Sequence, residues 1–466
     1  MGDDKMKHAI LIDFGSTFTK VAVTDIAAKR IIYTAKFPST VRTDARIGLK
    51  QCFDAATSAI GKQAFESAVK LSSSSAAGGL RMAVIGLTLT LSNTAGRNAA
   101  FGAGAKILQS FSGKITEKDI QSLEESDLEI ILFCGGYENG NSSTVLYNAK
   151  MLSQSKVTCP VIYAGNSTVA TTVRTLLAQY AKECFIVSNI IPNVGLLNTK
   201  PTESIIRDVF MKRIVNMKGL GNIQDSIDQV LMPTPAAVLE AGELLSRGCK
   251  TQAGLGPMMI VDIGGATTDI HTYVEHTAFE GARMLGAVEP YTKRTVEGDM
   301  GMRESSICLL REIGCEAMAK KIGISSSDLE DSINKRVHTT SFLADTEIEK
   351  RIEETIASGA AWVSARRHGG HIEHVHSSNC TAIQVGKNLT EIHTIIGTGG
   401  PLINSENPRA ILENVLADKK KEQDVLLPQT AEFFLDADYI LYAAGLLRHI
   451  DEDLALTVMK NSLQVI

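Results

Sequence analysis

The 466-residue sequence has no apolar run long enough to cross a bilayer, which argues against a membrane-spanning helix. Its start, MGDDKMKH, carries acidic residues and is followed by an apolar stretch too short for a signal peptide. The eight cysteines form no CxxC pair, so the usual spacings of zinc and iron–sulfur sites are missing. Scattered cysteines of this kind are typical of reduced intracellular thiols. We therefore expect a cytoplasmic protein with no membrane partner.

Basic and aromatic surfaces are also scarce. The formal net charge is -5, aromatic residues make up 5% of the chain, and there is one tryptophan. Binding to nucleic acid through its phosphates requires a basic face, so we expect no nucleic-acid partner. The sequence contains neither a GxxxxGK[ST] P-loop nor a well-placed GxGxxG fingerprint, which excludes the two commonest nucleotide-binding motifs. Hydrophobic residues account for 44%, enough to bury the cores of two or more domains.

Two short segments far apart in the chain share nearly the same pattern. The first is DFGSTFTK, from Asp13 to Lys20, and the second is DIGGATTD, from Asp262 to Asp269. Each lies between two β-prone runs, so each predicts a strand, an aspartate, a glycine-containing turn and a second strand. The matched pair predicts two related lobes that face one ligand.

The residue types in these turns suit a phosphate group and a magnesium ion. Glycine at positions 15, 264 and 265 permits a tight turn and close approach of a ligand, and successive backbone N–H groups can hold phosphate oxygens. The carboxylates of Asp13 and Asp262 would repel phosphate but can hold Mg²⁺ through water. The simpler alternative is a pair of ordinary β-hairpins.

The remaining pattern predicts an α/β protein with more than one layer. Strands are expected within residues 8–37 and 371–396, helices within 44–70 and 303–360, and a flexible break at 72–79.

Residues 81–217 alternate between short apolar runs and helical segments, which is typical of a parallel α/β layer. The expected strands are RMAVIGL, EIILFCGG, CPVIYAG and CFIVSNI, with helices near 94–110, 142–154, 167–181 and 202–217. FGAGAK (101–106) is interpreted as closely packed helix, and PTPAAVLEAGELLSRG (233–248) as a helix that begins at proline and ends at glycine.

The two hairpins resemble the phosphate-binding motifs of the superfamily of actin, DnaK-type chaperones and sugar kinases. Three further segments resemble its other motifs in order: MPTPAAVLEAGELL (232–245) the first connecting helix, HTIIGTGGPLI (393–403) the adenosine motif, and DADYILYAAGLL (436–447) the second connecting helix. The resemblance implies an α/β fold of two actin-like, ribonuclease H-like lobes around a nucleotide cleft, with an α/β insertion in the first lobe.

The same resemblance implies the domain limits. The first lobe would span 1–250, with a partner-docking α/β region at about 81–228. The second lobe would span 251–435 and hold the adenosine motif, and C-terminal helices at 436–466 would return to the first lobe.

Within the superfamily, the length and the segments DFGSTFTK, PTPAAVLEAGELL, RTVEGDMGMR (294–303), RRHGGHIEHV (366–375) and GTGGPLI resemble the glutamate-mutase-associated MutL family. That resemblance implies a chaperone-like factor that uses ATP to release damaged cobalamin from an adenosylcobalamin-dependent mutase, either glutamate mutase or a related aminomutase. ATP hydrolysis would be coupled to a conformational change. The chain departs from the family at CGGYENGN (134–141), where relatives tend to have a more acidic turn. It also lacks the DxHxxG pattern of cobalamin ligation.

The resemblance assigns residues to the nucleotide and its metal. Asp13 and Asp262 would hold Mg²⁺ and support catalysis. The cofactor-binding residues for ATP or ADP would be Gly15, Ser16, Thr17, Phe18, Lys20, Gly264, Gly265, Ala266, Thr267, Glu297, Gly397, Thr398, Gly399 and Gly400. Lys20 would neutralise phosphate charge or point to solvent, Glu297 or Asp299 would accept from the ribose or lie in an acidic helix turn, and Asp269 would be a structural acceptor. No single residue is identified as the group that orients water.

Two other functions use the same motifs, namely a small-molecule kinase and an actin-like structural ATPase. No carboxylate stands out as the base that a kinase would need beside its acceptor. A histidine cluster (His368, His371, His374 and His376, near Glu373) leaves a metal site open, although alternation along a strand would send these side chains to different faces.

Overall fold

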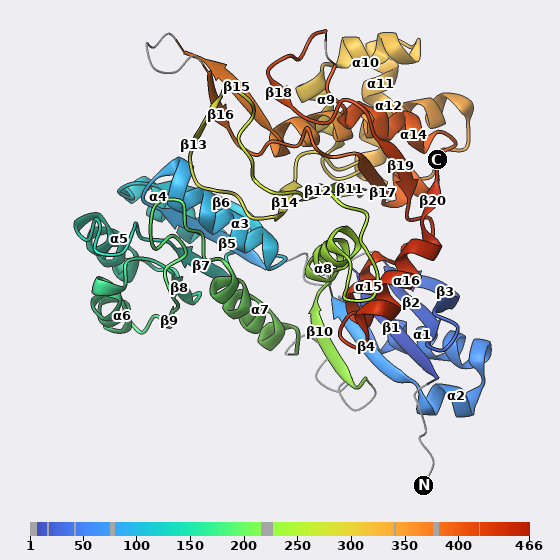
Figure 1. Cartoon of the computed structure of the whole chain (residues 1–466), viewed down its shortest axis with the longest axis horizontal. Helices are drawn as coiled ribbons and strands as arrows, with labels where there is room; N and C mark the ends of the chain where they lie inside the picture. Colours follow the sequence, from blue (N-terminus) through green and yellow to red (C-terminus); the bar gives the residue numbers. More distant parts are fainter. Residues whose placement is uncertain are drawn as a thin grey trace. The chain divides into compact units, whose positions relative to one another are not determined.

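The structure is a computed structural model that describes residues 7–15, 18–41, 43–74, 80–215, 227–339, 342–375, 382–418 and 420–466. The chain divides into two compact units. Unit 1 comprises Met1–Ala241, Gly286–Pro290 and Leu441–Asn461, and unit 2 comprises Gly242–Leu285, Tyr291–Ile440 and Ser462–Ile466. Figure 1 shows the secondary structure of both.

The first sheet of unit 1 contains the first hairpin. Its strands are β1 (His8–Phe14), β2 (Phe18–Asp25), β3 (Arg30–Pro38), β4 (Val69–Ser74) and β10 (Gln229–Pro233), in the order β10-β4-β1-β2-β3. β1, β2 and β3 are antiparallel neighbours, whereas β4 pairs parallel to both β1 and β10. The helices of this part are α1 (Ala45–Ile60), α2 (Lys62–Ser67), α8 (Thr234–Arg247), α15 (Leu441–Leu447) and α16 (Glu452–Ser462).

Helices α8 and α15 are the segments expected as connecting helices, and they approach closely within unit 1. A Cβ on Gly445 of α15 would lie 2.1 Å from the carbonyl oxygen of Ala237 in α8, so only glycine allows this contact. Both residues are fully buried. Because Gly445 has no side chain, α15 packs directly against α8.

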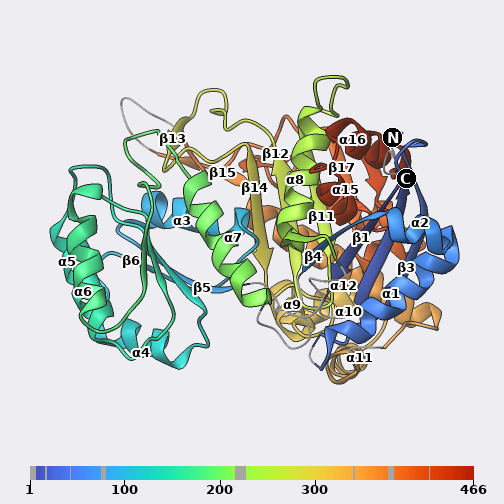
Figure 2. The ribbon, with the colours of Figure 1, turned by 90° about the horizontal axis from the view of Figure 1, so that it is seen from below.

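Unit 1 also contains a second, wholly parallel sheet. Its strands are β5 (Arg81–Gly86), β6 (Lys106–Ser112), β7 (Ile130–Phe133), β8 (Val161–Tyr163) and β9 (Cys184–Ile186), in the order β6-β5-β7-β8-β9. The helices are η1 (a π-helix, Leu89–Asn93), α3 (Thr94–Gly102), α4 (Glu117–Glu125), α5 (Ser143–Gln154), η2 (Ser167–Val169), α6 (Ala170–Ala178) and α7 (Lys200–Val215). Figure 2 shows α3 and α7 on one side of this sheet and α5 and α6 on the other.

Alternation along these strands explains the two covered faces. Met82 and Val84 belong to the core that includes α3 and α7, whereas Ala83 and Ile85 belong to the core under α4, α5 and α6. Both sets are fully buried, as expected for parallel strands with helices on each face.

The main sheet of unit 2 repeats the strand order of the first sheet. Its strands are β11 (Met258–Ile263), β12 (Thr268–Tyr273), β14 (Thr292–Glu297), β17 (Thr394–Thr398), β19 (Glu432–Leu435) and β20 (Gln464–Val465), in the order β14-β12-β11-β17-β19-β20. As in unit 1, the first three strands are antiparallel and the next two are parallel to the first. The predicted pair of ribonuclease H-like halves, with an α/β layer in the first, is therefore confirmed.

The rest of unit 2 consists of a small sheet and helices. The strands of the small sheet are β13 (Arg283–Leu285), β15 (Gly370–His374), β16 (Ala382–Val385) and β18 (Val425–Leu426). The helices are α9 (Ser306–Ile313), α10 (Cys315–Ile322), α11 (Ser326–His338), α12 (Glu347–His368), α13 (Gly400–Ile403), α14 (Pro408–Leu412) and η3 (Glu413–Val415). Within the described ranges, no helix is both long and apolar enough to span a membrane.

Several local predictions differ from the structure. The helix expected near 94–110 ends at Gly102, and 106–112 is strand β6, so FGAGAK is a helix end and a turn rather than a helix. Residues 69–74 form β4, where helix followed by a flexible break was expected, while 75–79 lie outside the described residues. More than half of the residues of each strand are polar, namely Lys70 and Ser72–Ser74 in β4 and Lys106, Gln109, Ser110 and Ser112 in β6, which weakens the apolar signal that marks a buried strand.

Candidate functional site

The two predicted hairpins have the same register. In unit 1, Asp13 pairs with Lys20, and the Gly15 N–H donates to the Phe18 carbonyl at 3.0 Å. In unit 2, Asp262 pairs with Asp269, and the Gly264 N–H donates to the Thr267 carbonyl at 2.9 Å. Each aspartate therefore lies at the same position, two residues before the glycine that closes the turn.

The carboxylate of Asp13 is buried among hydroxyl groups at one edge of its sheet. Thr234 Oγ1 donates to Asp13 Oδ1 at 2.5 Å, and Ser73 Oγ lies 3.2 Å from Thr234 Oγ1. Asp13, Ser73 and Thr234 lie at or just beyond the carboxyl ends of β1, β4 and β10, which are parallel neighbours. The strand order thus brings three oxygen-bearing side chains from distant parts of the sequence together.

Burial raises the pKa of Asp13, while the charge of Lys20 and hydrogen bonds from Thr234, Lys20 and Ser73 oppose that rise. Lys20 Nζ lies 3.7 Å from Asp13 Oδ2, so its ammonium group points toward the carboxylate. A buried carboxylate that is held by oxygen donors and has a raised pKa would be stabilised by a divalent cation.

The turn of the second hairpin is hydrogen-bonded on one side to the segment that follows β14. Backbone N–H groups of Met302 and Arg303 donate to the carbonyls of Gly264 (3.0 Å) and Gly265 (2.7 Å). Ser305 Oγ donates to the Ala266 carbonyl at 3.0 Å. Three successive carbonyls of the turn therefore point toward the 302–305 segment.

Because a trans peptide places C=O and the following N–H on opposite sides, the N–H groups of Gly265, Ala266 and Thr267 point away from that segment. None of the three has an acceptor within the described residues, and both Gly265 and Ala266 are exposed. Successive outward N–H groups of this kind bind anionic oxygens. The second hairpin thus presents three successive backbone N–H groups that no acceptor in the described residues occupies.

Gly301 allows the 302–305 segment to reach the turn. A Cβ at Gly301 would lie 2.3 Å from the Ala266 carbonyl carbon and 2.6 Å from the Gly265 oxygen, distances that no side chain tolerates. Gly298, three residues before Gly301, has no atom within 4 Å of its Cβ position. The two glycines therefore differ sharply in their role, although the sequence alone does not distinguish them.

Asp262 lies beside the end of β17. Thr398 is its parallel neighbour, and a Cβ on Gly399 would lie 2.9 Å from Asp262 Oδ1 and 2.2 Å from the Ile263 carbonyl oxygen. Gly399 also has φ +101°, which disfavours other residues. The chain can pass the Asp262 carboxylate at this distance only because position 399 has no side chain.

A third strand end completes this cluster in unit 2. Thr398 Oγ1 donates to Asp436 Oδ2 at 3.2 Å, and the Ile440 N–H donates to Asp436 Oδ1 at 2.9 Å. Asp436 follows β19 and is buried. Asp262, Thr398 and Asp436 therefore occupy the same edge of their sheet as Asp13, Ser73 and Thr234 occupy in theirs.

The charge opposite each aspartate differs between the hairpins. Lys20 lies opposite Asp13, whereas Asp269 lies opposite Asp262 and accepts from Arg294 Nη2 at 2.6 Å. Arg294 is buried in β14, so the positive charge in unit 2 comes from the neighbouring strand.

The structure places the other predicted nucleotide residues as follows. A Cβ on Gly397 would contact Leu412 and Leu402, so this glycine serves packing, whereas a Cβ on Gly400 would meet only Asn404 Nδ2, at 3.9 Å. Glu297 Oε2 accepts from Arg367 Nη1 at 3.0 Å. The side chain of Phe18 is 38% exposed, and Ser16 and Thr17 lie outside the described residues.

The predicted histidine cluster does not come together as a set. His368 ends α12, where its ring is buried and bonded to Thr272 and Thr295 at 2.8 Å each. Burial lowers its pKa well below 6.5, with Lys293 and Lys387 adding to that effect. His371 and His374 are exposed on β15, and His376 lies outside the described residues. No group of three or more metal-binding side chains is found in the described part of the chain.

The donor set at Asp13 fits magnesium. A carboxylate and two hydroxyl oxygens are hard ligands, and Mg²⁺ is commonly held by one or two carboxylates while it retains water. The sequence did not identify Ser73, Thr234 or Asp436 as part of either site. Their only sequence signal is a polar residue at or just after a short β-prone run, and that signal is common.

Two comparisons with known proteins each cover nearly the whole chain. The chain matches the family model described as MutL protein over residues 9–463. It is 37% identical over 460 residues to Protein MutL of Clostridium tetanomorphum, covering 98% of this chain and 99% of that protein.

Two solved structures show weaker similarity. The xylulose kinase from Bifidobacterium adolescentis is 11% identical, with a TM-score of 0.33 and coverage of 98% of this chain and 95% of the kinase. The ethanolamine utilization protein EutJ from Carboxydothermus hydrogenoformans is 12% identical, with a TM-score of 0.24 and coverage of 97% and 90%. These TM-scores are low, and the fold assignment rests on the strand orders instead.

Proposed function

Because the chain belongs to the MutL protein family, we propose that it is an ATP-dependent reactivating factor for an adenosylcobalamin-dependent mutase of the glutamate mutase type. In this proposal the two hairpins bind the phosphates of ATP and its Mg²⁺. The main support is the second turn, whose carbonyls are tied to the 302–305 segment and whose three N–H groups face outward.

Each part of the site has a defined task in this proposal. Asp13 and Asp262 hold Mg²⁺, which neutralises charge on the phosphate oxygens when bound. Ser73 and Thr234 orient the Asp13 carboxylate through their hydroxyl groups. Gly265, Ala266 and Thr267 donate backbone N–H groups to phosphate oxygens. The site would position the phosphates, and no base that orients water is identified among its described residues; slow hydrolysis would suit a switch.

ATP hydrolysis would serve the partner through conformational change. The nucleotide can shift the protein only if ATP and ADP favour different states, and the mutase responds only if its affinity differs between those states. The α/β region at about 81–228, of which the structure describes 81–215 and 227–228, lies outside the ribonuclease H-like core, and we assign mutase docking to it. The protein is expected to act in the cytoplasm on mutase subunits whose cobalamin has been damaged.

The direct test is recovery of an inactivated mutase. Mutase with damaged cofactor is mixed with this protein, fresh adenosylcobalamin, Mg²⁺ and ATP, and we expect activity to return. A non-hydrolysable ATP analogue, Asp13→Asn and Asp262→Asn should each prevent recovery. Asp54→Asn removes an exposed carboxylate from α1 and should leave recovery intact.

Two outcomes would contradict the proposal. ATP consumption without any return of mutase activity would remove the reactivating role. Transfer of labelled phosphate to a sugar or a short acid, instead of its release as inorganic phosphate, would identify a kinase.

A further inference from the structure

The parallel sheet of unit 1 has a topological switch point that the nucleotide proposal does not use. In the order β6-β5-β7-β8-β9, the chain goes from β5 to one side and then crosses to β7 on the other. The loops after β5 and β7 therefore diverge and leave a crevice at the carboxyl ends of the strands. Open α/β sheets with this strand order bind small ligands at that point.

A cavity lies at this position. It has a volume of about 260 Å³ and is bounded by the loops that follow β5, β6 and β7. This volume is near the lower end of the roughly 300–1,000 Å³ that is usual for small-molecule sites, so it suits a small ligand or one end of a larger ligand. The short π-helix η1, a rare element that often marks functional sites, forms one wall through Leu91 and Ser92.

The charges around the cavity favour an anion. None of its lining residues is acidic, and Lys114 lines it from the loop after β6. Lys114 forms no ion pair in the part of the chain that the structure describes; its Nζ lies 5.3 Å from the centre of the Tyr147 ring. Glu138 directly follows the lining residue Tyr137. Its carboxylate accepts from the N–H and the hydroxyl of Ser167, at 3.0 and 2.6 Å, and is not among the residues that line the cavity.

The polar groups of the cavity wall are held in place before any ligand arrives. Ser92 Oγ accepts from the Leu87 and Thr88 N–H groups at 2.8 and 3.1 Å, which fixes the loop after β5. Asn141 Oδ1 accepts from the Thr144 N–H at 3.0 Å and sets the start of α5. The first turn of α5 has no acidic residue, so its positive end is uncompensated there.

The loop after β7 requires glycine at the cavity wall. Gly136 has φ +56°, and a Cβ there would lie 3.0 Å from the Leu87 side chain. This is the CGGYENGN loop at which the chain departs from the family pattern. Its glycines keep the wall open between the loops after β5 and β7.

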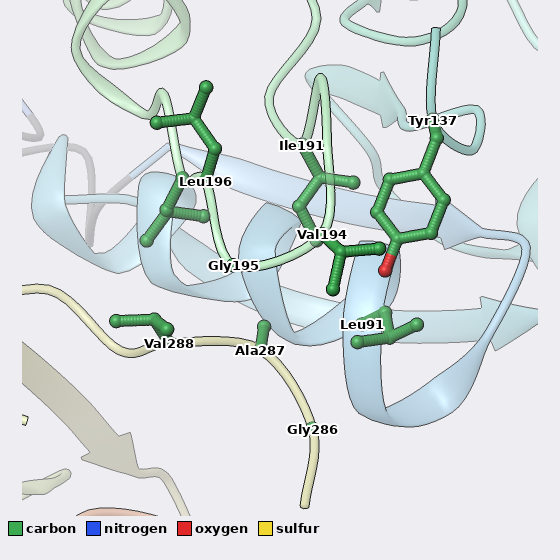
Figure 3. A pocket seen from close by; sticks show the side chains of 10 residues that line it. Leu91, Tyr137, Ile191, Val194, Gly195, Leu196, Gly286, Ala287 and Val288 are labelled. Carbon is green, nitrogen blue, oxygen red and sulfur yellow. The ribbon is translucent and has the colours of Figure 1, made fainter. Parts of the chain in front are cut away.

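The opposite side of the cavity is apolar. Leu87, Leu91, Tyr137 and Ile191 line it. Figure 3 draws a neighbouring pocket that shares Leu91, Tyr137 and Ile191 with this cavity, and these three residues come from three separate segments. The Tyr137 ring offers a flat surface to an aromatic or apolar group.

We propose that this crevice binds a small organic phosphate ester. Its phosphate would lie near Lys114 and the start of α5, and its apolar or aromatic part would lie against Leu91, Tyr137 and Ile191. The site is separate from the two hairpins and does not depend on their binding ATP. It gives the α/β layer of residues 81–215 a ligand of its own.

Calorimetric titration of the full-length protein with phenyl phosphate tests the proposal. We expect saturable binding of phenyl phosphate, weaker binding of inorganic phosphate, and no binding of phenol. Lys114→Gln should weaken binding at least about tenfold, as expected for loss of one charge-assisted contact. Lys150→Gln removes the same charge from the exposed face of α5 and should change nothing.

A variant that fills the cavity and a variant of the hairpin site serve as further controls. Thr144→Phe should fill the cavity and block phenyl phosphate while the melting temperature stays near the wild-type value. Asp13→Asn should leave phenyl phosphate binding intact, since that residue belongs to the hairpin site. Equal binding by wild type, Lys114→Gln and Thr144→Phe, or no binding at all, would overturn the proposal. Loss of binding in Asp13→Asn would place the ester at the hairpins instead.

Discussion

Gly301→Ala tests whether the tied-down turn of the second hairpin is needed for nucleotide binding. The new Cβ would lie 2.3 Å from the Ala266 carbonyl carbon, whereas ordinary contact begins at 3.4 Å. The turn must therefore move by about 1.1 Å, the difference between those two distances. The three atoms nearest to this Cβ are all backbone atoms of the turn, so no side chain can rotate away to relieve the contact.

The size of the effect follows from that shift. Overpacking of this kind costs about 1–3 kcal/mol of stability. A displacement of ~1 Å in a positioned group can cost ~100-fold in rate. Loss of even one N–H bond to a charged phosphate oxygen, worth ~1.5–3 kcal/mol, lowers affinity by about tenfold or more. We therefore expect Gly301→Ala to raise the Kd for Mg-ATP at least tenfold and to lower kcat about 100-fold.

The assay combines calorimetric titration of Mg-ATP with steady-state phosphate release. Circular dichroism and thermal melting establish that the variant is folded. Gly298→Ala is the matched control, because its Cβ meets no atom within 4 Å although it lies only three residues before Gly301. Wild-type affinity in a folded Gly301→Ala protein would refute the reasoning, and so would an equal loss in Gly298→Ala.

Three further predictions concern stability in the absence of nucleotide. Burial raises the pKa of Asp13, so its carboxyl group binds a proton more tightly in the folded protein than in the unfolded chain. The free energy of unfolding should therefore fall as pH rises from the unfolded pKa of ~3.9 through the folded pKa. Asp13→Asn should remove this contribution to the pH dependence of the free energy of unfolding, measured by urea unfolding at several pH values. An unchanged pH dependence would contradict a raised pKa of Asp13. Arg336 is fully buried and pairs with Glu349 and Glu353, so Arg336→Met should destabilise the protein by about 3 kcal/mol in urea unfolding, and a change below 1 kcal/mol would be inconsistent with a buried pair. The buried Tyr273 hydroxyl has no hydrogen-bond partner in the described residues, so Tyr273→Phe should keep or raise stability by up to about 1 kcal/mol, as read from the thermal melting curve.

The hairpins could be predicted from the sequence because their information is local. An apolar run, an aspartate and a glycine-containing turn lie within eight residues, and the pattern occurs twice. The pairing of Asp13 with Lys20, and of Asp262 with Asp269, follows from the length of the turn. The confirmed fold class depends on the same local signal and on the alternation of strands and helices after residue 80.

The neighbours of the aspartates could not be predicted because they depend on sheet order. Thr234 reaches Asp13 across 221 residues of sequence, and it does so because β10 lies next to β4. The interpretation of 72–79 as a flexible break concealed β4 itself, and with it Ser73. Gly301 carries no signal of its own, since a glycine that allows a backbone contact and one that faces open space look alike in a sequence.

The division of unit 1 into three separate segments has a consequence for synthesis on the ribosome. Tyr442 Oη lies 3.5 Å from the Leu11 carbonyl oxygen, and these residues are separated by 431 positions. At ~5–20 residues per second, the ribosome synthesises α15 about 20–90 s after β1, against which α15 packs. Nascent chains that stall before residue 441 would have all five strands of the first sheet but would lack α15 and α16, so the apolar residues that α15 covers should depend on a chaperone until these helices emerge.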